Sequence, residues 1–286
     1  MSKNKKHNTV SKDAPLDVCI LTAGRYDLLA KSLDAVYAEA QTTPLNIYIL
    51  ENGVDAKERI GYEHLLAYQP EKDPAKGVVR FQTKRSQQNT GFPVGSNEVA
   101  KMGRAPLIMF LGDDVELQPG AIRQVMEDFN DQTIGIVGIK LLFPLSSTDR
   151  NRPAGKVQHV GMAVNIRGEP IHPLIGWSAG HPKCNVTRDA WAVTGACFSI
   201  RRNLFQRLGG FDPIFGLGTH EDLDLCLRVR QSGHRVYLDV RAVGYHYVGA
   251  TAEKLKVAFP IQQNRSIFMS RWQNSGQIFW NDWEYL

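Results

Sequence analysis

The sequence predicts an α/β protein with a mainly parallel sheet, helices on both faces and a mixed strand extension in the second half. Three observations indicate this. Over roughly the first 130 residues, short apolar runs alternate with stretches of helical periodicity, as in successive strand–helix–strand units. Beyond Ile134 the pattern changes to strand-rich segments separated by loops that contain Pro and Gly. The chain has 286 residues, of which 43% are hydrophobic and 22% charged, which suits one elaborated domain with a sizeable core.

The first half begins with a strand, a turn and a helix. Residues 17–22 (DVCILT) form a short apolar run that Ala-Gly closes, and apolar residues then recur at helical spacing from Leu29 to Ala40. The elements expected next are a strand at 45–50, a helix near 56–68, a strand near 78–82, a short helix at 96–102 and a strand at 107–111. This order predicts parallel strands, and in open sheets of this kind ligands bind beyond the carboxyl ends of the strands.

The second half is predicted to add mixed strands and one strong helix, at 221–231. Its strand-like segments are 134–140 (IGIVGIK), 157–164 (VQHVGMAV), 190–200 (AWAVTGACFSI) and 235–240 (RVYLDV). We therefore divide the chain into a tail at 1–14, one α/β domain at 15–250 with halves at about 15–130 and 131–250, and a helical, aromatic extension at 251–286.

Charge and hydropathy exclude several classes of protein. The 34 Lys and Arg exceed the 29 Asp and Glu by a net charge of +5, but four of the lysines and one aspartate lie in the first fourteen residues. We expect that basic tail to be disordered and the folded body to be near neutral, which argues against a nucleic-acid partner. No apolar run approaches the roughly 18 residues of a membrane-spanning helix.

The N-terminal segment and the cysteines indicate the compartment. Because the first residues lack the apolar stretch of a signal peptide, we expect a cytoplasmic protein that is at most peripheral to a membrane. The four cysteines are scattered, without a Cys-x-x-Cys pair, so no disulfide is expected. Zinc is not expected either, because His181-x-x-Cys184 lacks a second close pair of ligands.

A first group of acids follows the apolar strand at 107–111. Asp113 and Asp114 come directly after Gly112, at the carboxyl end of that strand, where hard divalent cations find the oxygen ligands they prefer. A turn whose acids face water, or cap the helix that Pro119 begins, explains the same residues. The spacing alone leaves both interpretations open.

A second group of acids opens the predicted helix at 221–231. Thr219-x-x-Asp222 has the form of a capping box, and acids in a first helical turn are stabilised by about 0.3 to 1 kcal/mol each. Asp224 and Arg228 stand four apart, as in an exposed pair worth about 0.2 to 0.5 kcal/mol. A general base at the edge of a cleft also suits these carboxylates. His246, after the strand at 235–240, is by itself typical of a structural histidine.

Taken in order, five segments resemble the family-two glycosyltransferases of the GT-A (Rossmann-like) fold. The resemblance runs from about Asp17 to Gly249. The matching segments are VCILTAGRYDLLAKSLDAV, IYILENGVD, QNTGFPVGSNEVAK, IMFLGDDVELQPGAI, and the acceptor-side stretch from GACFSI through GGFD and HEDLD to YHYVG. Each match alone is weak, and their common order makes the resemblance specific.

The resemblance implies an inverting transferase that moves a hexose or deoxyhexose from a nucleotide-diphospho-sugar to an acceptor hydroxyl. The expected donors are UDP, dTDP or GDP sugars, and the acceptor is a carbohydrate, a lipid-linked glycan or a protein. Residues 15–130 then form the nucleotide-binding half and 131–250 the acceptor half. The leaving diphosphate implies a divalent metal, Mn²⁺ or Mg²⁺, that acts as a Lewis acid.

Residue by residue, the resemblance places the metal at Asp114, the final Asp of the family's Asp-x-Asp motif. His246 matches the late His that completes the coordination, and Asp113 takes the middle position, near the ribose or the metal. Gly112 departs from the acidic first position. An ion that keeps waters and bridges diphosphate oxygens tolerates the resulting smaller number of protein ligands.

The donor nucleotide is expected to contact the first turn and the ends of neighbouring strands. Thr22, Ala23 and Arg25 would line it from the first turn. Further candidates are Glu51, which stands where the family usually has Asp, Asn52, Arg85 and Asn97.

Asp222 matches the family's catalytic base, with Glu221 beside it. An acceptor hydroxyl needs a carboxylate to take its proton as the new bond forms, an effect worth roughly 10²- to 10⁴-fold. In the acceptor half, Trp177 and Trp191 are candidates for stacking on sugar rings, with packing on the core as the alternative.

Two other functions stay open at this point. One is a catalytically silent module that binds a glycan or a nucleotide on the same fold. The other is a sugar-phosphate nucleotidyltransferase, which shares the phrase at 21–25 but needs a Gly-rich continuation where a helix begins here. The final fifteen residues contain Trp272, Trp280 and Trp283, for which core packing, a homodimer contact and interfacial membrane attachment are all compatible.

Overall fold

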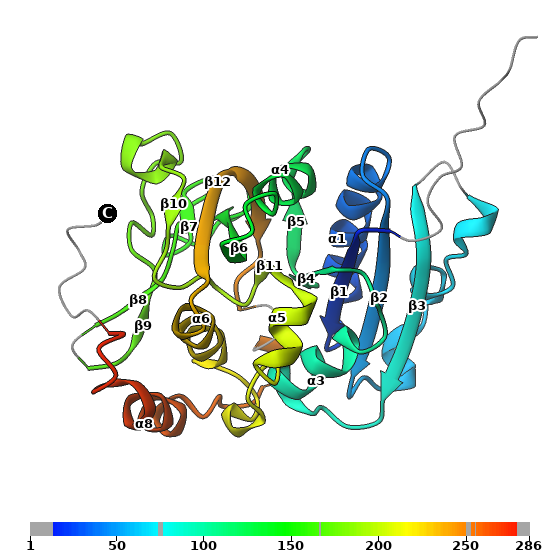
Figure 1. Ribbon diagram of the computed structural model, residues 1–286. Coiled ribbons are helices and arrows are strands. Elements are labelled where there is room, and N and C mark those ends of the chain that lie inside the picture. The colour runs from blue at the N-terminus through cyan, green and yellow to red at the C-terminus, as the bar shows by residue number, and fades with distance from the viewer. Residues whose placement is uncertain (1–13, 74–76, 166, 250–252, 255, 279–286) are drawn as a thin grey trace, which may run out of the picture.

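The computed structural model describes residues 14–73, 77–165, 167–249, 253–254 and 256–278 (Figure 1). The predicted tail, apart from residue 14, and the last aromatic residues, including Trp280 and Trp283, lie outside the described residues. No helix within the described ranges is long and apolar enough to cross a membrane.

A single large sheet organises the chain, and its described part has ten strands (Figure 1). Four of them run parallel in the order β4-β1-β2-β3, with bounds Leu107–Gly112, Leu16–Thr22, Leu45–Asn52 and Val78–Ser86. This arrangement confirms the predicted parallel sheet and places the carboxyl ends of these strands at one edge.

The second half extends the same sheet with mixed strands, as predicted. Strand β11 (Cys197–Arg201) lies antiparallel between β4 and β6 (Ile134–Leu142), and β12 (Arg235–His246) then runs parallel to β6. Shorter strands complete it: β5 (Val115–Leu117), β7 (Val157–His159) and β10 (Arg188–Asp189) in the sheet, and the separate pair β8 (Ala163–Val164) and β9 (Pro170–Ile171).

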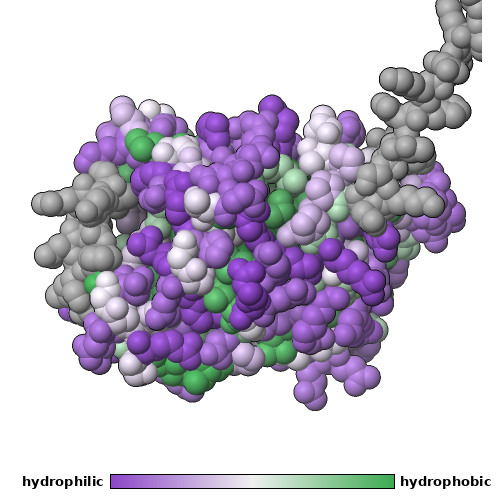
Figure 2. Space-filling model, in the orientation of Figure 1, coloured by the Kyte–Doolittle hydropathy of each residue, from purple (hydrophilic) through white to green (hydrophobic). Residues whose placement is uncertain are grey.

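Helices cover both faces of the sheet, because alternate strand residues point to opposite sides. In β1, Val18 and Ile20 belong to one core cluster and Cys19 to the other. The first cluster contains α1 (Tyr26–Ala40) and α4 (Ala121–Asp128). The second contains α3 (Gly91–Ala100), α5 (Arg202–Arg207), α6 (Glu221–Gln231) and α8 (Ile261–Trp272). The face drawn in Figure 2 is mostly hydrophilic, with small separate apolar areas, as expected when the apolar residues fill two internal cores.

Several predicted boundaries are wrong for identifiable reasons. The helix expected near 56–68 is broken into a 3₁₀ turn, η1 (Ala56–Arg59), and a short α2 (Glu63–Leu66), because Gly61 lies between them at φ +86°. The segment 157–164 forms two short strands rather than one. Helix α3 starts at Gly91, five residues before the prediction, since the Asn89 side chain accepts the Gly91 N–H. The four cysteines are free and buried, which confirms that prediction.

A buried ion pair joins the start of β1 to α5. Asp17 is fully buried, and its Oδ2 accepts a hydrogen bond from the Arg202 guanidinium. The same guanidinium also donates to the carbonyl oxygens of Ala100, at 2.7 Å, and Ala105. This one side chain therefore ties α5, β1 and the loop before β4 together.

We expect Arg202→Ala to lower the free energy of unfolding by about 3 to 5 kcal/mol, because it leaves the Asp17 carboxylate buried without its cation. Thermal or urea unfolding measures the loss. Arg123→Ala is the control, since it removes an exposed pair with Glu127 that is worth about 0.3 to 0.5 kcal/mol. Equal unfolding free energies for the two variants would contradict the role given to Arg202.

Candidate active site

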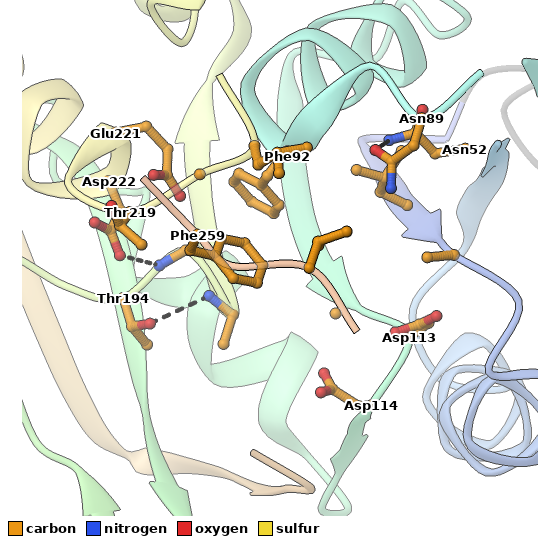
Figure 3. Close-up of a pocket in the computed structure, with 18 of the residues that line it drawn as sticks. Asn52, Asn89, Phe92, Asp113, Asp114, Thr194, Thr219, Glu221, Asp222 and Phe259 are labelled. Carbon is orange, nitrogen blue, oxygen red and sulfur yellow. Dashed lines mark hydrogen bonds between the residues drawn. The ribbon is translucent and has the colours of Figure 1, made fainter. Parts of the chain in front are cut away.

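A cavity of about 260 Å³ opens at the carboxyl ends of β1, β2 and β4 (Figure 3). Ala23, Asn52, Asp113 and Asp114 line it from the first half of the chain. Gly195, Glu221, Asp222 and His246 line it from the second half. In Figure 3 the two acidic groups lie on opposite sides of this space, with Phe259 between them. The two motifs that are far apart in the sequence thus meet in one site.

The first acidic group lies in the turn between β4 and β5. Asp113 is 3% exposed, its Oδ2 has no hydrogen-bond partner, and burial together with the neighbouring Asp114 raises its pKa to about 8. A hydrogen bond with the Thr22 side chain opposes this rise. Space explains the Gly at the first position of the motif, because a Cβ at Gly112 would lie 2.7 Å from Oδ1 of Asp114.

His246, at the end of β12, lines the same cavity as Asp114 and lies next to it. Its Nε2 lies 3.5 Å from Oδ1 of Asp114, and its Nδ1 lies 3.2 Å from Oε1 of Gln158. A neutral imidazole that donates Nδ1–H to Gln158 turns the lone pair of Nε2 toward the carboxylate.

The donors present fit a divalent cation that takes much of its shell from elsewhere. No group of three or more His, Cys, Asp or Glu arranged to hold a metal occurs among the described residues. Asp114 and His246 nevertheless offer one oxygen and one nitrogen side by side, with the unpartnered Oδ2 of Asp113 in the same turn. Mn²⁺ or Mg²⁺, which retains waters and binds phosphate oxygens, needs no more from the protein.

The second acidic group begins α6, but not as the predicted capping box. The N-cap residue is His220, in the left-handed region at φ +67°, and no side chain caps the helix. Asp222 instead accepts hydrogen bonds from the backbone N–H of Gly195, at 2.9 Å, and of Leu223, at 2.8 Å. The loop before β11, which contains Gly195, therefore helps to fix the orientation of this carboxylate. The prediction that Thr219 and Asp222 form a capping box is wrong.

Burial changes the acidity of both carboxyls in this group. It raises the pKa of Asp222 above its usual value, opposed by the two backbone hydrogen bonds. Burial and the adjacent Asp222 raise the pKa of Glu221 well above its usual range, and Oε2 of Glu221 has no partner. Carboxyls with raised pKa values that line a cavity are typical of general acid–base sites.

Asp224 differs from its two neighbours: its predicted pair with Arg228 is confirmed, but the prediction that the pair is exposed is wrong. The side chain is fully buried and accepts hydrogen bonds from Arg228, Arg271 and the indole N–H of Trp272, at 2.8, 2.7 and 2.9 Å. Two residues along a helix differ by about 200° in direction, so Asp224 points away from the face of Asp222. Its role is to dock α8.

The predicted nucleotide-binding residues divide into two groups. Ala23, Asn52 and Asp113 line the cavity, and Thr22 lies directly behind it, bonded to Asp113. Asn52 also holds the turn before α3, since its Oδ1 accepts the Thr90 N–H at 2.9 Å.

The remaining candidates lie outside the lining of this cavity. Arg25 pairs with Asp27 and lines a neighbouring hollow. Glu51 is buried, accepts a hydrogen bond from the Tyr26 hydroxyl and pairs with Arg59. Arg85 donates to the carbonyl oxygen of Val54. The Asn97 side chain donates to the carbonyl oxygen of Phe211 and accepts the N–H of the same residue. These contacts hold the fold around the site.

The two predicted acceptor tryptophans also lie outside the cavity lining. Trp191 packs against the core, and its indole N–H donates to the carbonyl oxygen of Gln277 at 2.7 Å. Trp177 is 43% exposed and packs edge-on against the ring of His181. The packing alternative accounts for Trp191.

Sequence reasoning did not single out several cavity residues. Asn89 and Phe92 lie within the family-like segment QNTGFPVGSNEVAK, and the resemblance of that segment could have indicated them. Thr194 comes from a segment predicted only as a strand, whereas Gly195 begins the family-like segment GACFSI. Phe259, together with Val257, comes from the segment after β12, where no motif marked it.

A family model covers most of the chain, and two curated proteins match part of it. A family model described as glycosyltransferase like family 2 matches residues 14–268. The O-antigen biosynthesis protein RfbC of Myxococcus xanthus is 32% identical over 168 residues, which is 56% of this chain and 12% of that protein. The uncharacterized protein y4gI of Sinorhizobium fredii (strain NBRC 101917 / NGR234) is 26% identical over 161 residues, 54% of this chain and 17% of that protein. The matched regions are thus less than a fifth of these relatives.

Solved structures share the fold at low sequence identity. GalNAc-T7 with UDP, GalNAc and Mn²⁺ has a TM-score of 0.65 at 14% identity, over 91% of this chain and 48% of that one. The mannosyltransferase PcManGT from Pyrobaculum calidifontis, in complex with GDP-Man and Mn²⁺, has a TM-score of 0.58 at 12% identity, over 93% and 72%. S. aureus TarS 1–349 in complex with UDP-GlcNAc has a TM-score of 0.53 at 10% identity, over 83% and 60%. These likenesses show the arrangement of the sheet and its helices.

Proposed function

Because the chain belongs to glycosyltransferase family 2 and has the GT-A fold, we propose that it transfers a sugar from a nucleotide-diphospho-sugar to an acceptor hydroxyl, with inversion. One observation carries the proposal: the lining of a single cavity includes Asp114 and His246, and also Asp222, which lies on the side opposite Asp114 (Figure 3) and is half-buried. The reaction needs these two functions, a site for the leaving diphosphate and a base for the acceptor.

Asp114 and His246 are the residues proposed to hold Mn²⁺ or Mg²⁺, and the solved structures of GalNAc-T7 and PcManGT both contain Mn²⁺. When bound, such an ion stabilises the negative charge that develops on the diphosphate. Gln158 holds the ring of His246, and Thr22 holds Asp113. These contacts keep the metal-facing groups oriented.

Asp222 is proposed to accept the proton of the acceptor hydroxyl. The acceptor oxygen attacks the anomeric carbon from the face opposite the diphosphate, the bond from that carbon to the diphosphate oxygen breaks, and the configuration inverts. The N–H groups of Gly195 and Leu223 orient the carboxylate. Phe92 and Phe259 supply apolar walls that exclude water from the reacting groups.

Glu221 is proposed to contact a sugar hydroxyl. Its raised pKa favours the protonated form, which donates a hydrogen bond, and its Oε2 is buried at the cavity without a partner. A substrate hydroxyl supplies the partner that the free protein lacks.

The donor nucleotide is proposed to lie along Ala23 and Asn52, which line the cavity from the ends of β1 and β2. UDP, dTDP and GDP sugars remain the candidate donors. Among carbohydrate, lipid-linked and protein acceptors, the name of the M. xanthus relative, an O-antigen biosynthesis protein, favours a carbohydrate.

We expect one nucleoside diphosphate to raise the melting temperature in a Mn²⁺-dependent way. A ligand at 100 times its Kd adds about 2.7 kcal/mol of stability, which thermal-shift measurement detects. The diphosphates UDP, dTDP and GDP are compared, each with and without Mn²⁺, with the monophosphate CMP alongside them. The absence of a shift with every nucleotide would contradict donor binding and favour the silent glycan-binding module.

The products separate the remaining alternatives. An inverting transferase releases nucleoside diphosphate and forms a glycoside of opposite anomeric configuration, which NMR of the product identifies. A nucleotidyltransferase releases pyrophosphate. Retention of configuration would overturn the mechanism proposed for Asp222.

A further inference from the structure

The turn before the two catalytic acids has an unfavourable backbone conformation. Thr219 and His220 lie in the left-handed region, at φ +81° and +67°, although neither is glycine. Such consecutive conformations persist only where the surrounding structure holds them, and they concentrate at functional sites. Glu221 and Asp222 follow directly, so whatever holds this turn also sets the direction of their side chains.

Helix α8 packs against this segment with one face. Its buried residues are Asn264, Phe268 and Trp272, which stand four apart and therefore lie on one side of the helix. Figure 1 shows α8 beside α6, at the end of the molecule opposite β3. The contacts of the three residues all lead to the turn or to the first part of α6.

Asn264 makes the contacts to the turn itself. It is 1% exposed, and its Nδ2 lies 2.8 Å from the carbonyl oxygen of Phe215, 2.7 Å from that of Gly218 and 3.1 Å from that of Thr219. The Thr219 hydroxyl oxygen lies 3.2 Å away. The two N–H groups of this amide are shared among the converging carbonyl oxygens, of which that of Phe215 also accepts the Gly218 N–H at 3.1 Å. Removing the amide therefore takes a donor away from the carbonyls of Gly218 and Thr219.

The other two residues of this face secure the elements on either side. The ring of Phe268 lies 5.5 Å from that of His220, whose Nε2 is 3.2 Å from the carbonyl oxygen of Gly168. Trp272 donates to Asp224 on α6. Within this face, Asn264 is the residue that contacts the backbone of Gly218 and Thr219, while Phe268 contacts the His220 ring and Trp272 contacts α6.

We propose that Asn264 is a positioning residue, which holds the left-handed turn at 219–220 and thereby directs Glu221 and Asp222 into the cavity. The inference rests on the function proposed for Asp222. The residues proposed for the metal and the nucleotide, by contrast, lie at the ends of β1, β2, β4 and β12, away from Asn264. Loss of the Asn264 amide therefore affects the chemical step and leaves donor binding intact.

The test compares Asn264→Leu, of similar shape but without donors, with Gln263→Leu, the same kind of change at an exposed neighbour on α8. We expect Asn264→Leu to lower kcat by about 10- to 100-fold, the scale of a displaced catalytic group. The KM for the donor and the Mn²⁺-dependent thermal shift should stay at wild-type values, as should every parameter of Gln263→Leu. Wild-type kcat in folded Asn264→Leu overturns the proposal, and so does a parallel loss of kcat and donor binding.

A milder variant covers the case in which the Leu variant does not fold. Asn264→Ser keeps one donor, so we expect a smaller loss of kcat, again without a change in donor binding. Unchanged kcat in Asn264→Ser, with the Leu variant unfolded, overturns the proposal.

Hydrogen exchange separates this inference from the proposed function. In Asn264→Leu or Asn264→Ser, without any substrate, the amides of residues 218–223 should exchange faster while those of β1 and β2 do not change. Unchanged exchange at 218–223 overturns the role of Asn264. Faster exchange in a protein whose wild type shows no transfer means that Asn264 does hold the turn and that the proposed function fails.

Discussion

We expect Asp222→Asn to lower kcat by about 10²- to 10⁴-fold, the contribution of a general base, while the donor still binds. The amide has nearly the same shape and its oxygen still accepts the N–H of Gly195, but it cannot take the proton of the acceptor. Steady-state kinetics with the donor identified by thermal shift measure the loss. Asp34→Asn, which makes the same change at an exposed position on α1, is the control and keeps wild-type turnover.

The pH profile tests the same assignment. Burial raises the pKa of Asp222, and the base works only when deprotonated. Activity therefore falls as the pH is lowered through that raised pKa, at a higher pH than an ordinary aspartate would give. The acidic limb should disappear from the residual activity of Asp222→Asn. A variant with full turnover, or with an unchanged acidic limb, would rule out this base.

We expect Asp114→Asn to abolish the Mn²⁺-dependent part of the nucleotide shift and to lower kcat/KM by about 10²-fold or more. A metal on a leaving diphosphate is worth several kcal/mol, and each 1.36 kcal/mol is tenfold in rate. The amide keeps the size of the side chain but removes the charge that lies 3.5 Å from His246. Mn²⁺ titration by calorimetry or electron paramagnetic resonance measures the loss of the ion directly.

Glu116→Gln is the matched control for this change. It removes the same charge two residues away, on β5, where the side chain lies near the Tyr247 hydroxyl instead of in the cavity lining. We expect its metal binding and kinetics to remain close to wild type. If both variants lose Mn²⁺ equally, the effect comes from the local potential, and Asp114 is not a specific ligand.

Much of the fold was predictable because its signals are local. The short apolar runs of β1 and β4 and the helical spacing in α1 are patterns within a few neighbouring residues, and the structure follows them closely. The single helix expected near 56–68 failed for the same kind of reason, since Gly61 interrupts it with a positive φ.

The candidate site was predictable where its residues end strands. Asp113 and Asp114 follow β4, and the edge of a parallel sheet gathers such residues. Spacing could not show which acid of the second group faces the cavity. Asp222 and Asp224 are the same residue type in the same helical turn. Asp222 accepts the Gly195 N–H and lines the cavity, whereas Asp224 accepts the Trp272 N–H and docks α8.

The sequence by itself determined the strand and helix order, the family resemblance and the acids at the end of β4. Only the tertiary structure decided that Asp224 docks α8, that Trp191 packs on the core, and that the Asn264 amide contacts the backbone before Asp222. The physical reason is the separation along the chain of the residues that interact. Strand and helix periodicities arise from neighbours along the chain, whereas the role of a polar side chain depends on partners that folding brings from distant segments.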